Sequence, residues 1–382
     1  MSELVNARKT KTDFRFQLLA TASAIVLAGA AFATQQAIAA DDDSDRAPVW
    51  IELGGQLSRL DERQEAFAPP FMAGRPAIFS PSQKFESLPL SSIDEFGEIS
   101  FEPNGSGWVL SASALYGRSS NNKHVHQQTH PSSFIPTKYG VPSPIPPIAP
   151  AAARFADTLV RNDESHLIVD FQAGKDVGLG MFGERGSSVL SLGVRFAQFQ
   201  SRSNMSLKSD PDWRFHTKYT RGLKIARQPY HSNLAHLSAA RSFQGVGPSL
   251  SWKASEPLMR DSQGSELAAD WGLNVAILFG RQRTKASHEA TGLFHSSFNF
   301  YKGGHTVVYQ PTPAKADRAR TITISNVGGF AGATWRIQNV KVSAGYRADL
   351  FFGAMDGGID AAKKENVGFY GPFATISIGI GG

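Results

Sequence analysis

The chain has 382 residues, of which 19% are charged and 10% aromatic, with 36 glycines and no cysteine. The lack of cysteine excludes disulfides, thiol nucleophiles and cysteine-based zinc sites. Residues 1–39 carry four basic and two acidic residues, so residues 40–382 keep +4 of the formal net charge of +6, too little to indicate a nucleic-acid partner. Beyond the N-terminus no apolar run approaches about 18 residues, which argues against a helical membrane protein.

The first 39 residues have the three parts of a cleavable signal peptide. A basic start precedes an apolar stretch at 18–33, which is too short for a comfortable transmembrane helix. Ala37-Ile38-Ala39 then provides the small residues of a cleavage site, and an acidic run follows from Asp41. The basic residues are Arg8, Lys9, Lys11 and Arg15. We therefore expect residues 1–39 to be removed and the rest to be exported.

The expected cleavage can be tested directly on the protein from membranes. N-terminal sequencing should start near Ala40 or Asp41, because the small-residue motif ends at Ala39. A membrane-bound chain that starts at Met1 or Ser2 would contradict export by this signal.

Apolar residues recur at every second position along residues 40–382. In one stretch the apolar positions are Leu273, Val275 and Ile277. The alternate positions hold Gly272, Asn274 and other small or polar residues. A lipid-facing barrel strand has this pattern because successive side chains point to opposite faces. The pattern predicts an all-β fold, a transmembrane antiparallel β-barrel of about ten strands, with eight to twelve possible. The expected strands are 48–58, 94–102, 108–118, 164–176, 187–200, 237–254, 265–282, 319–336, 340–353 and 368–381.

Short and long connections alternate between these strands. Gln338-Asn339 and Pro103-Asn104-Gly105-Ser106-Gly107 mark short turns, and the long segments are 59–93, 119–163, 201–236 and 283–319. Short periplasmic turns and long extracellular loops are typical of outer-membrane barrels. Ten strands would place both chain ends on the periplasmic side. We therefore expect residues 40–382 to form one barrel with four long extracellular loops.

Two glycine-rich stretches interrupt the alternation. The apolar positions change parity between Phe243 and Leu250, across Gly245, Gly247 and Pro248. A β-bulge would explain the change, because a bulge inserts one unpaired residue. The stretch 327–332 predicts a similar bulge.

The C-terminal third resembles a known family. The residues that carry the resemblance are Gly245-Val246-Gly247-Pro248-Ser249-Leu250-Ser251-Trp252, Asp270-Trp271-Gly272, Gly328-Gly329-Phe330-Ala331-Gly332, Gly345-Tyr346-Arg347-Ala348-Asp349, Gly353-Ala354-Met355-Asp356-Gly357-Gly358 and Phe369-Tyr370-Gly371-Pro372-Phe373. This region, roughly 235–382, is similar to the pore-forming outer-membrane protein family related to the Legionella major outer membrane protein. The resemblance implies a barrel and, more loosely, porin-like activity. The chain lacks the terminal aromatic residue that many barrels present to the assembly machinery, and Phe373 is the nearest aromatic residue.

The alternation places a set of charged residues on the face toward the lumen. Such charges can form a constriction that sorts ions, or they can pair and fill a narrow interior. A ten-stranded lumen is narrow, which slightly favours pairing. The candidates for pore charges are Glu52, Asp170, Arg195, Asp270, Lys341, Arg347 and Asp349.

The segment 201–236 is strongly basic and would face outward. An extracellular basic loop can bind lipopolysaccharide phosphates, although an ordinary solvated loop is equally consistent with the sequence. The candidate contacts are Arg214, Lys218, Arg221, Lys224 and Arg227. The expected partners are outer-membrane lipid, lipopolysaccharide and the barrel-assembly machinery, with no nucleic acid and an oligomeric state that the sequence leaves open.

Three functions remain possible at this level. The leading hypothesis is a porin-like passive pore for small solutes or ions, and the alternative is a structural or adhesive surface barrel with a closed lumen. A rim enzyme is the third, with His166, His236, His288 and Asp163 near the expected rim, but no catalytic motif groups them. We therefore expect no enzyme activity and no cofactor. We also expect no metal, since His124, His126 and His130 fit a solvated loop better than a metal site.

Overall fold

The structure is a computed structural model, and it leaves the expected signal peptide outside the described residues. The described residues are 49–60, 64–67, 83–86, 91–103, 107–128, 155–177, 187–210, 218–220, 223–226, 230–261, 265–295, 306–309, 314–358 and 362–380.

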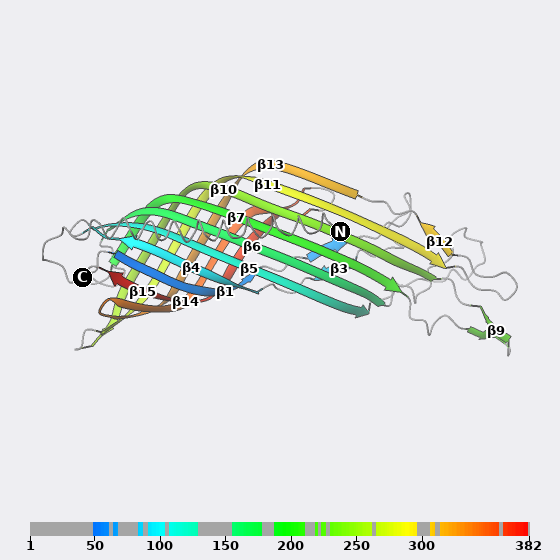
Figure 1. The fold of residues 1–382 in the computed structure, drawn as a ribbon, viewed down its shortest axis with the longest axis horizontal. Helices are drawn as coiled ribbons and strands as arrows, with labels where there is room; N and C mark the ends of the chain where they lie inside the picture. The colour runs from blue at the N-terminus through cyan, green and yellow to red at the C-terminus, as the bar shows by residue number, and fades with distance from the viewer. Residues whose placement is uncertain are drawn as a thin grey trace, which may run out of the picture.

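Ten long strands form one closed antiparallel sheet, in the order β10-β7-β6-β5-β4-β1-β15-β14-β13-β11, with β11 pairing back onto β10 (Figure 1). The first and last strands lie side by side, since Val49 pairs with Ile380. The predicted ten-stranded barrel is therefore confirmed. The strands are β1 (Val49–Leu60), β4 (Ser91–Phe101), β5 (Trp108–Gln128), β6 (Phe155–Asp176), β7 (Ser187–Asp210), β10 (Tyr230–Arg260), β11 (Ser265–His295), β13 (Ala314–Ile337), β14 (Val340–Asp356) and β15 (Lys364–Ile380).

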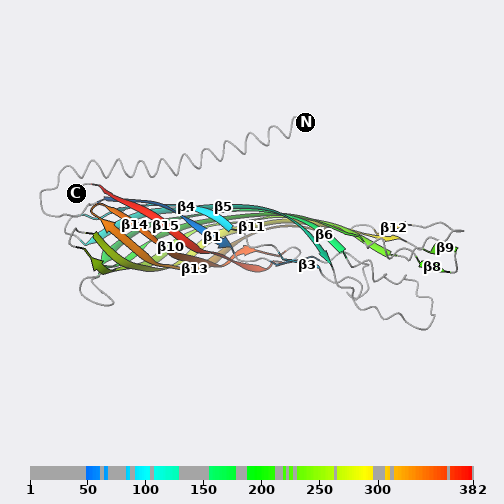
Figure 2. The same ribbon diagram turned by 90° about the horizontal axis from the view of Figure 1, so that it is seen from below.

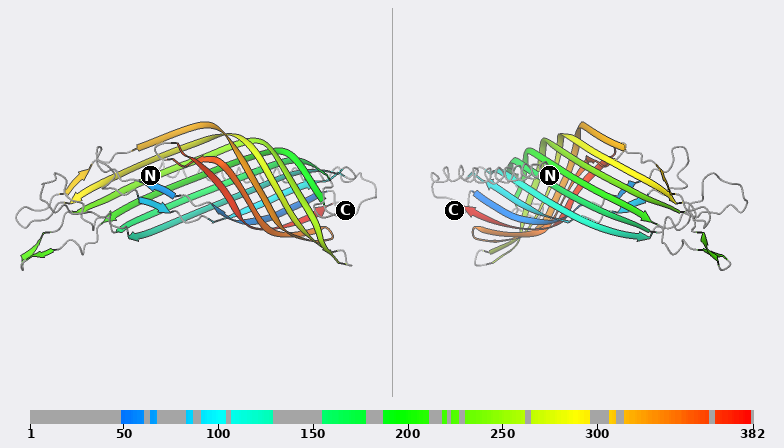
Figure 3. Two further views of the ribbon diagram at one scale, coloured as in Figure 1. Left: turned by 180° about the vertical axis from the view of Figure 1, so that it is seen from behind. Right: turned by 45° about the vertical axis from the view of Figure 1, so that its right-hand side comes forward.

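The barrel has one end with short connections and one with long connections. At the short-turn end Gln338 and Asn339 join β13 to β14, and Gln338 takes a positive φ of 49° in this tight turn. The start of β1 and the end of β15 lie at the same end (Figure 3). At the other end, called the long-loop end, short hairpins and an added strand accompany the long connections. These are β2 (Gln64–Phe67) with β3 (Gln83–Glu86), β8 (Lys218–Thr220) with β9 (Leu223–Ala226), and β12 (Thr306–Tyr309) on β11.

Six strands continue beyond the closed barrel as one curved wall, β5, β6, β7, β10, β11 and β13 (Figure 2). The β4–β5 ladder stops at Ile93 and Arg118, whereas the β5–β6 ladder continues to Gln128 and Phe155. The segments predicted as the loops 119–163, 201–236 and 283–319 therefore begin and end with strand residues. The prediction stopped the strands too early because their outer faces turn polar here: Arg202 and Arg283, for example, are exposed. With few apolar residues on the outer face, the period that marks a membrane strand becomes hard to detect in the sequence.

The outer face of the barrel carries an apolar belt, which is the surface that a transmembrane barrel presents to lipid. On β11 the side chains of Leu273, Val275, Ile277 and Phe279 are each 43–58% exposed. Other exposed members of the belt are Leu53, Leu57, Leu110, Phe171, Leu192, Val194, Val327, Val342, Tyr346, Ile376 and Ile378. Among the described residues no helix has the length and apolarity needed to cross a membrane.

The two bulges predicted at glycine-rich stretches are wrong. Along β10 the alternation of buried and exposed residues continues from Leu237 to Leu250, and Phe243 points into the lumen. The register to β11 stays constant across Gly247 and Pro248, although the ladder pairs no residue there, as expected where proline lacks an N–H donor. The β13–β14 register is likewise continuous through 327–332. The prediction assumed that the lumen is polar, so it took every apolar residue as facing lipid. Part of the lumen is in fact apolar, and Phe243 points into that part. The apparent change in facing therefore does not mark a bulge.

Candidate functional site: the barrel lumen

The lumen contains a cavity of about 490 Å³ in the half toward the short-turn end. All seven charged residues that the alternation placed toward the lumen line this cavity: Glu52, Asp170, Arg195, Asp270, Lys341, Arg347 and Asp349. Sequence reasoning did not single out Glu98 and Lys253, which also line it. Both residues occupy alternate positions that face the lumen, so the alternation in the sequence was sufficient to identify them.

Arg195 holds the deepest charged group of the cavity together. Its guanidinium donates Nε and Nη2 to the two carboxylate oxygens of Asp170, at 2.7 and 2.8 Å. Nη1 donates to the side-chain oxygens of Asn274, at 2.6 Å, and of Asn326. Asp349 completes the group, with Oδ1 3.7 Å from Nη1. Arg195 is only 5% exposed, so this is a buried ionic network that reaches from β7 to β14 across the lumen.

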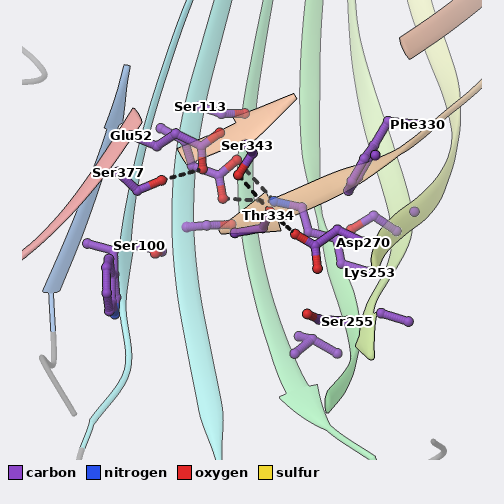
Figure 4. A pocket seen from close by; sticks show the side chains of 18 of the residues that line it. Glu52, Ser100, Ser113, Lys253, Ser255, Asp270, Phe330, Thr334, Ser343 and Ser377 are labelled. Carbon is purple, nitrogen blue, oxygen red and sulfur yellow. Dashed lines mark hydrogen bonds and ion pairs between the residues drawn. The ribbon is translucent and has the colours of Figure 1, made fainter. Parts of the chain in front are cut away.

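Nearer the short-turn end, the carboxylates bind neighbouring donors. Lys253 Nζ lies 2.8 and 3.0 Å from the two carboxylate oxygens of Glu98. Ser377 donates to Glu52 at 3.2 Å, and Thr334 donates to Asp270 (Figure 4). The second oxygen of Asp270 is buried without a hydrogen-bond partner among the described residues.

Two cations of β14 meet aromatic rings. Lys341 Nζ lies 3.8 Å from the ring centroid of Trp50. The Arg347 guanidinium lies 4.5 Å from the centroid of Phe96, 5.2 Å from Phe373 and 5.9 Å from Phe330. These distances are within the range of cation–π interactions.

Above the cavity, toward the long-loop end, the lumen is filled by one apolar cluster. Its members point inward from eight strands, and most of them are less than 5% exposed. Phe199 lies two positions after Ala197 on the inward face of β7, but sequence reasoning did not single it out. The buried members are Leu115, Ile168, Ala197, Phe199, Phe243, Ala276, Leu278, Ile324, Phe351, Ala354, Met355, Val367 and Phe369.

Aromatic rings of this cluster touch across the full width of the lumen. Phe199 on β7 and Phe369 on β15 stand five strands apart in both directions around the barrel, yet their ring centroids are 5.6 Å apart. Phe351 on β14 makes an edge contact with Phe199 at 4.7 Å. The lumen is therefore packed with side chains at this level.

The end of β14 folds into the lumen, where Ala354 and Met355 belong to the cluster, and we call residues Gly353–Gly358 the inner turn. Gly353 has a φ of +67°, a conformation that glycine adopts readily, and the β14–β15 register shifts between Phe351 and Met355. Side chains from three other strands bind the inner turn. Gln282 donates to the Ala354 carbonyl at 3.0 Å, Arg241 to the Gly357 carbonyl at 3.3 Å, and Arg318 to Asp356 at 2.9 Å and to the Gly358 carbonyl at 2.6 Å.

A second buried polar group lies beside the cluster. His166 Nε2 is 3.2 Å from Asp94 Oδ2, and Ser58 and Ser92 donate to the same carboxylate. Gly117 makes this approach possible, because a Cβ there would lie 2.0 Å from Asp94 Oδ1 and 2.2 Å from His166. Asp94 and His166 are 0% and 3% exposed, so the group is packed in the interior and offers no open site.

The structure does not bring the four rim residues together. His166 points into the lumen, whereas His236 is exposed on the outer face of β10. Asp163 instead accepts a hydrogen bond from Ser120 at 2.7 Å. Among the described residues no three His, Asp or Glu side chains gather as a metal site would require.

Only part of the predicted basic loop can be located. Lys218 and Lys224 lie on the paired strands β8 and β9. Arg214, Arg221 and Arg227 lie outside the described residues.

Comparisons with known proteins find no matching family model and no matching curated protein. Among solved structures, the transport unit of the autotransporter AIDA-I from Escherichia coli aligns with 89% of this chain and 92% of its own, at 8% identity and a TM-score of 0.26. The toluene transporter TodX from P. putida aligns with 89% of this chain and 90% of its own, at 8% identity and a TM-score of 0.20. The fold assignment rests on the strand register of this chain itself.

Proposed function

We propose that this chain is an exported outer-membrane β-barrel whose lumen is closed to passive diffusion, and that its wall and loops at the long-loop end act at the cell surface. In this orientation the short turns and the cavity face the periplasm. The apolar belt contacts lipid, and the basic segment 201–236 contacts lipopolysaccharide. The barrel-assembly machinery would insert the chain.

One observation carries this proposal: side chains from opposite strands meet inside the lumen. The centroid separation of 5.6 Å between Phe199 and Phe369 leaves no continuous aqueous path between them. Beneath them the Arg195 network crosses from β7 to β14. A ten-stranded barrel is narrow enough for its own side chains to fill it. Of the two leading sequence hypotheses, the geometry favours the closed barrel over the porin-like pore.

A gated pore is the second candidate function, and the inner turn favours it. This turn is the end of β14 with Gly357 and Gly358 after it, and side chains, including Arg318, bind it inside the lumen. If those contacts were lost, the segment could leave the lumen and widen it. Such a pore would agree with the family that the C-terminal third resembles.

Single-channel recordings in a planar bilayer test both candidates. We expect the wild-type protein to give no current steps, because the apolar cluster closes the lumen. An open general porin in the same bilayer is the positive control. Stable current steps from the wild-type protein would contradict a closed lumen.

The variant Arg318→Gln separates the two candidates. If the barrel is simply closed, this variant stays silent, because the phenylalanine cluster is intact. If the inner turn is a gate, its release withdraws Ala354 and Met355 from the cluster, and the variant conducts while the wild type does not. Arg283→Gln is the matched control, since Arg283 is exposed on the outer face of the wall.

A further inference from the structure

Three cationic side chains line one wall of the cavity, from its mouth at the short-turn end inward. They are Arg336 at the end of β13, and Lys341 and Arg347 on β14. Lys341 and Arg347 share the inward parity of β14, with only the small residues Ser343 and Gly345 between them on that face. None of the three forms an ion pair with a carboxylate of the described residues.

Four of the carboxylates that line the cavity are bound by other groups. Glu98 pairs with Lys253, and Asp170 pairs with Arg195. Glu52 and Asp270 accept hydrogen bonds from Ser377 and Thr334. Arg336 donates Nε to the Gln338 carbonyl at 3.4 Å, which leaves Lys341 and Arg347 as the cations of this wall whose N–H groups face the cavity without a hydrogen bond to a described residue.

Arg347 is the best placed of these cations to bind a ligand. Its guanidinium is half-buried and packs against Phe96, Phe373 and Phe330. Such packing orients the planar group, because a guanidinium stacks on aromatic faces while its N–H edge stays free. That edge presents donors in a geometry that matches a carboxylate bidentately. A half-buried arginine without an acceptor is a costly arrangement unless water or a ligand satisfies it.

We propose that the cavity binds a small organic carboxylate with an apolar body. The carboxylate would accept hydrogen bonds from Arg347, and the apolar body would contact the rings of Phe96, Phe330 and Phe373. A volume of about 490 Å³ fits such a molecule and lies in the usual range of ligand pockets. The ligand enters from the short-turn end, because the Arg195 network and the apolar cluster close the other side. Lys341 and Arg336 lie near that mouth and attract the anion.

Calorimetric titration of the full-length protein, folded in an uncharged detergent, tests this site with three probes. Benzoate and hexanoate carry the carboxylate on an aromatic and on an aliphatic body, and benzamide lacks the charge. We expect at least one carboxylate to bind and benzamide to bind at least about tenfold more weakly, since hydrogen bonds to a charged group are the stronger ones. No binding of either carboxylate, or equal binding of benzamide, would overturn the proposal.

Variants assign the binding to Arg347. Arg347→Gln should weaken carboxylate binding at least about tenfold, and Arg347→Lys should weaken it less, because the charge stays but the bidentate geometry is lost. Arg283→Gln, on the outer face of the wall, should bind like the wild type. Heat-dependent mobility on gels checks that each variant is folded. If Arg347→Gln does not fold, Arg347→Lys decides. Unchanged affinity in the folded Arg347 variants would overturn the assignment.

Discussion

Replacing Arg195 by methionine is expected to lower the free energy of unfolding by about 3–5 kcal/mol. The arginine donates to Asp170, Asn274 and Asn326, and it is only 5% exposed. Its loss leaves the carboxylates of Asp170 and Asp349 buried without a counterion, which costs more than the ion pair itself contributes. Urea unfolding, followed by tryptophan fluorescence in an uncharged detergent, measures the change.

Two further variants show whether the effect comes from the buried charges. The triple variant Arg195→Met, Asp170→Asn and Asp349→Asn should recover much of the lost stability, because it removes the unpaired carboxylates along with the cation. The control Arg283→Met should stay within about 0.5 kcal/mol of the wild type, since that side chain is exposed. A loss below about 1 kcal/mol for Arg195→Met would show that Arg195 does not hold the network together.

Replacing Val275 by arginine is expected to cost about 2–4 kcal/mol of folding free energy in a lipid bilayer. Val275 lies near the middle of the apolar belt on β11, where it is 43% exposed. A cation at that depth faces hydrocarbon and must distort the bilayer or reach toward the headgroups. Folding into phospholipid vesicles at a series of urea concentrations measures the loss.

The matched control places the same side chain inside the barrel. Ser111 lines the cavity, so Ser111→Arg puts the charge next to water and polar groups and should cost much less. Asn274 would be a poor control, although it neighbours Val275, because it accepts a hydrogen bond from Arg195. Equal costs for Val275→Arg and Ser111→Arg would contradict the facing of β11.

The sequence by itself indicated a barrel of about ten strands and the facing of most of them, although not that of β10 before Gly245. An alternating strand has a period of two, so one exposed apolar residue such as Leu273 fixes the facing of its neighbours, including Asp270 and Asn274. The same period placed Arg195 and Arg347 in the lumen, and it carries no information about their partners.

Only the tertiary structure decided what fills the lumen. Partners across a barrel come from strands far apart in the chain: Arg195 meets Asn326, and Phe199 meets Phe369. Their contact depends on the stagger and tilt of the closed sheet, which the period of one strand does not encode. The inner turn and the wall likewise depend on tertiary contacts. Beyond the belt, the strands are surrounded by water instead of lipid, so their outer face need not be apolar. Pairing with neighbouring strands keeps the chain extended there.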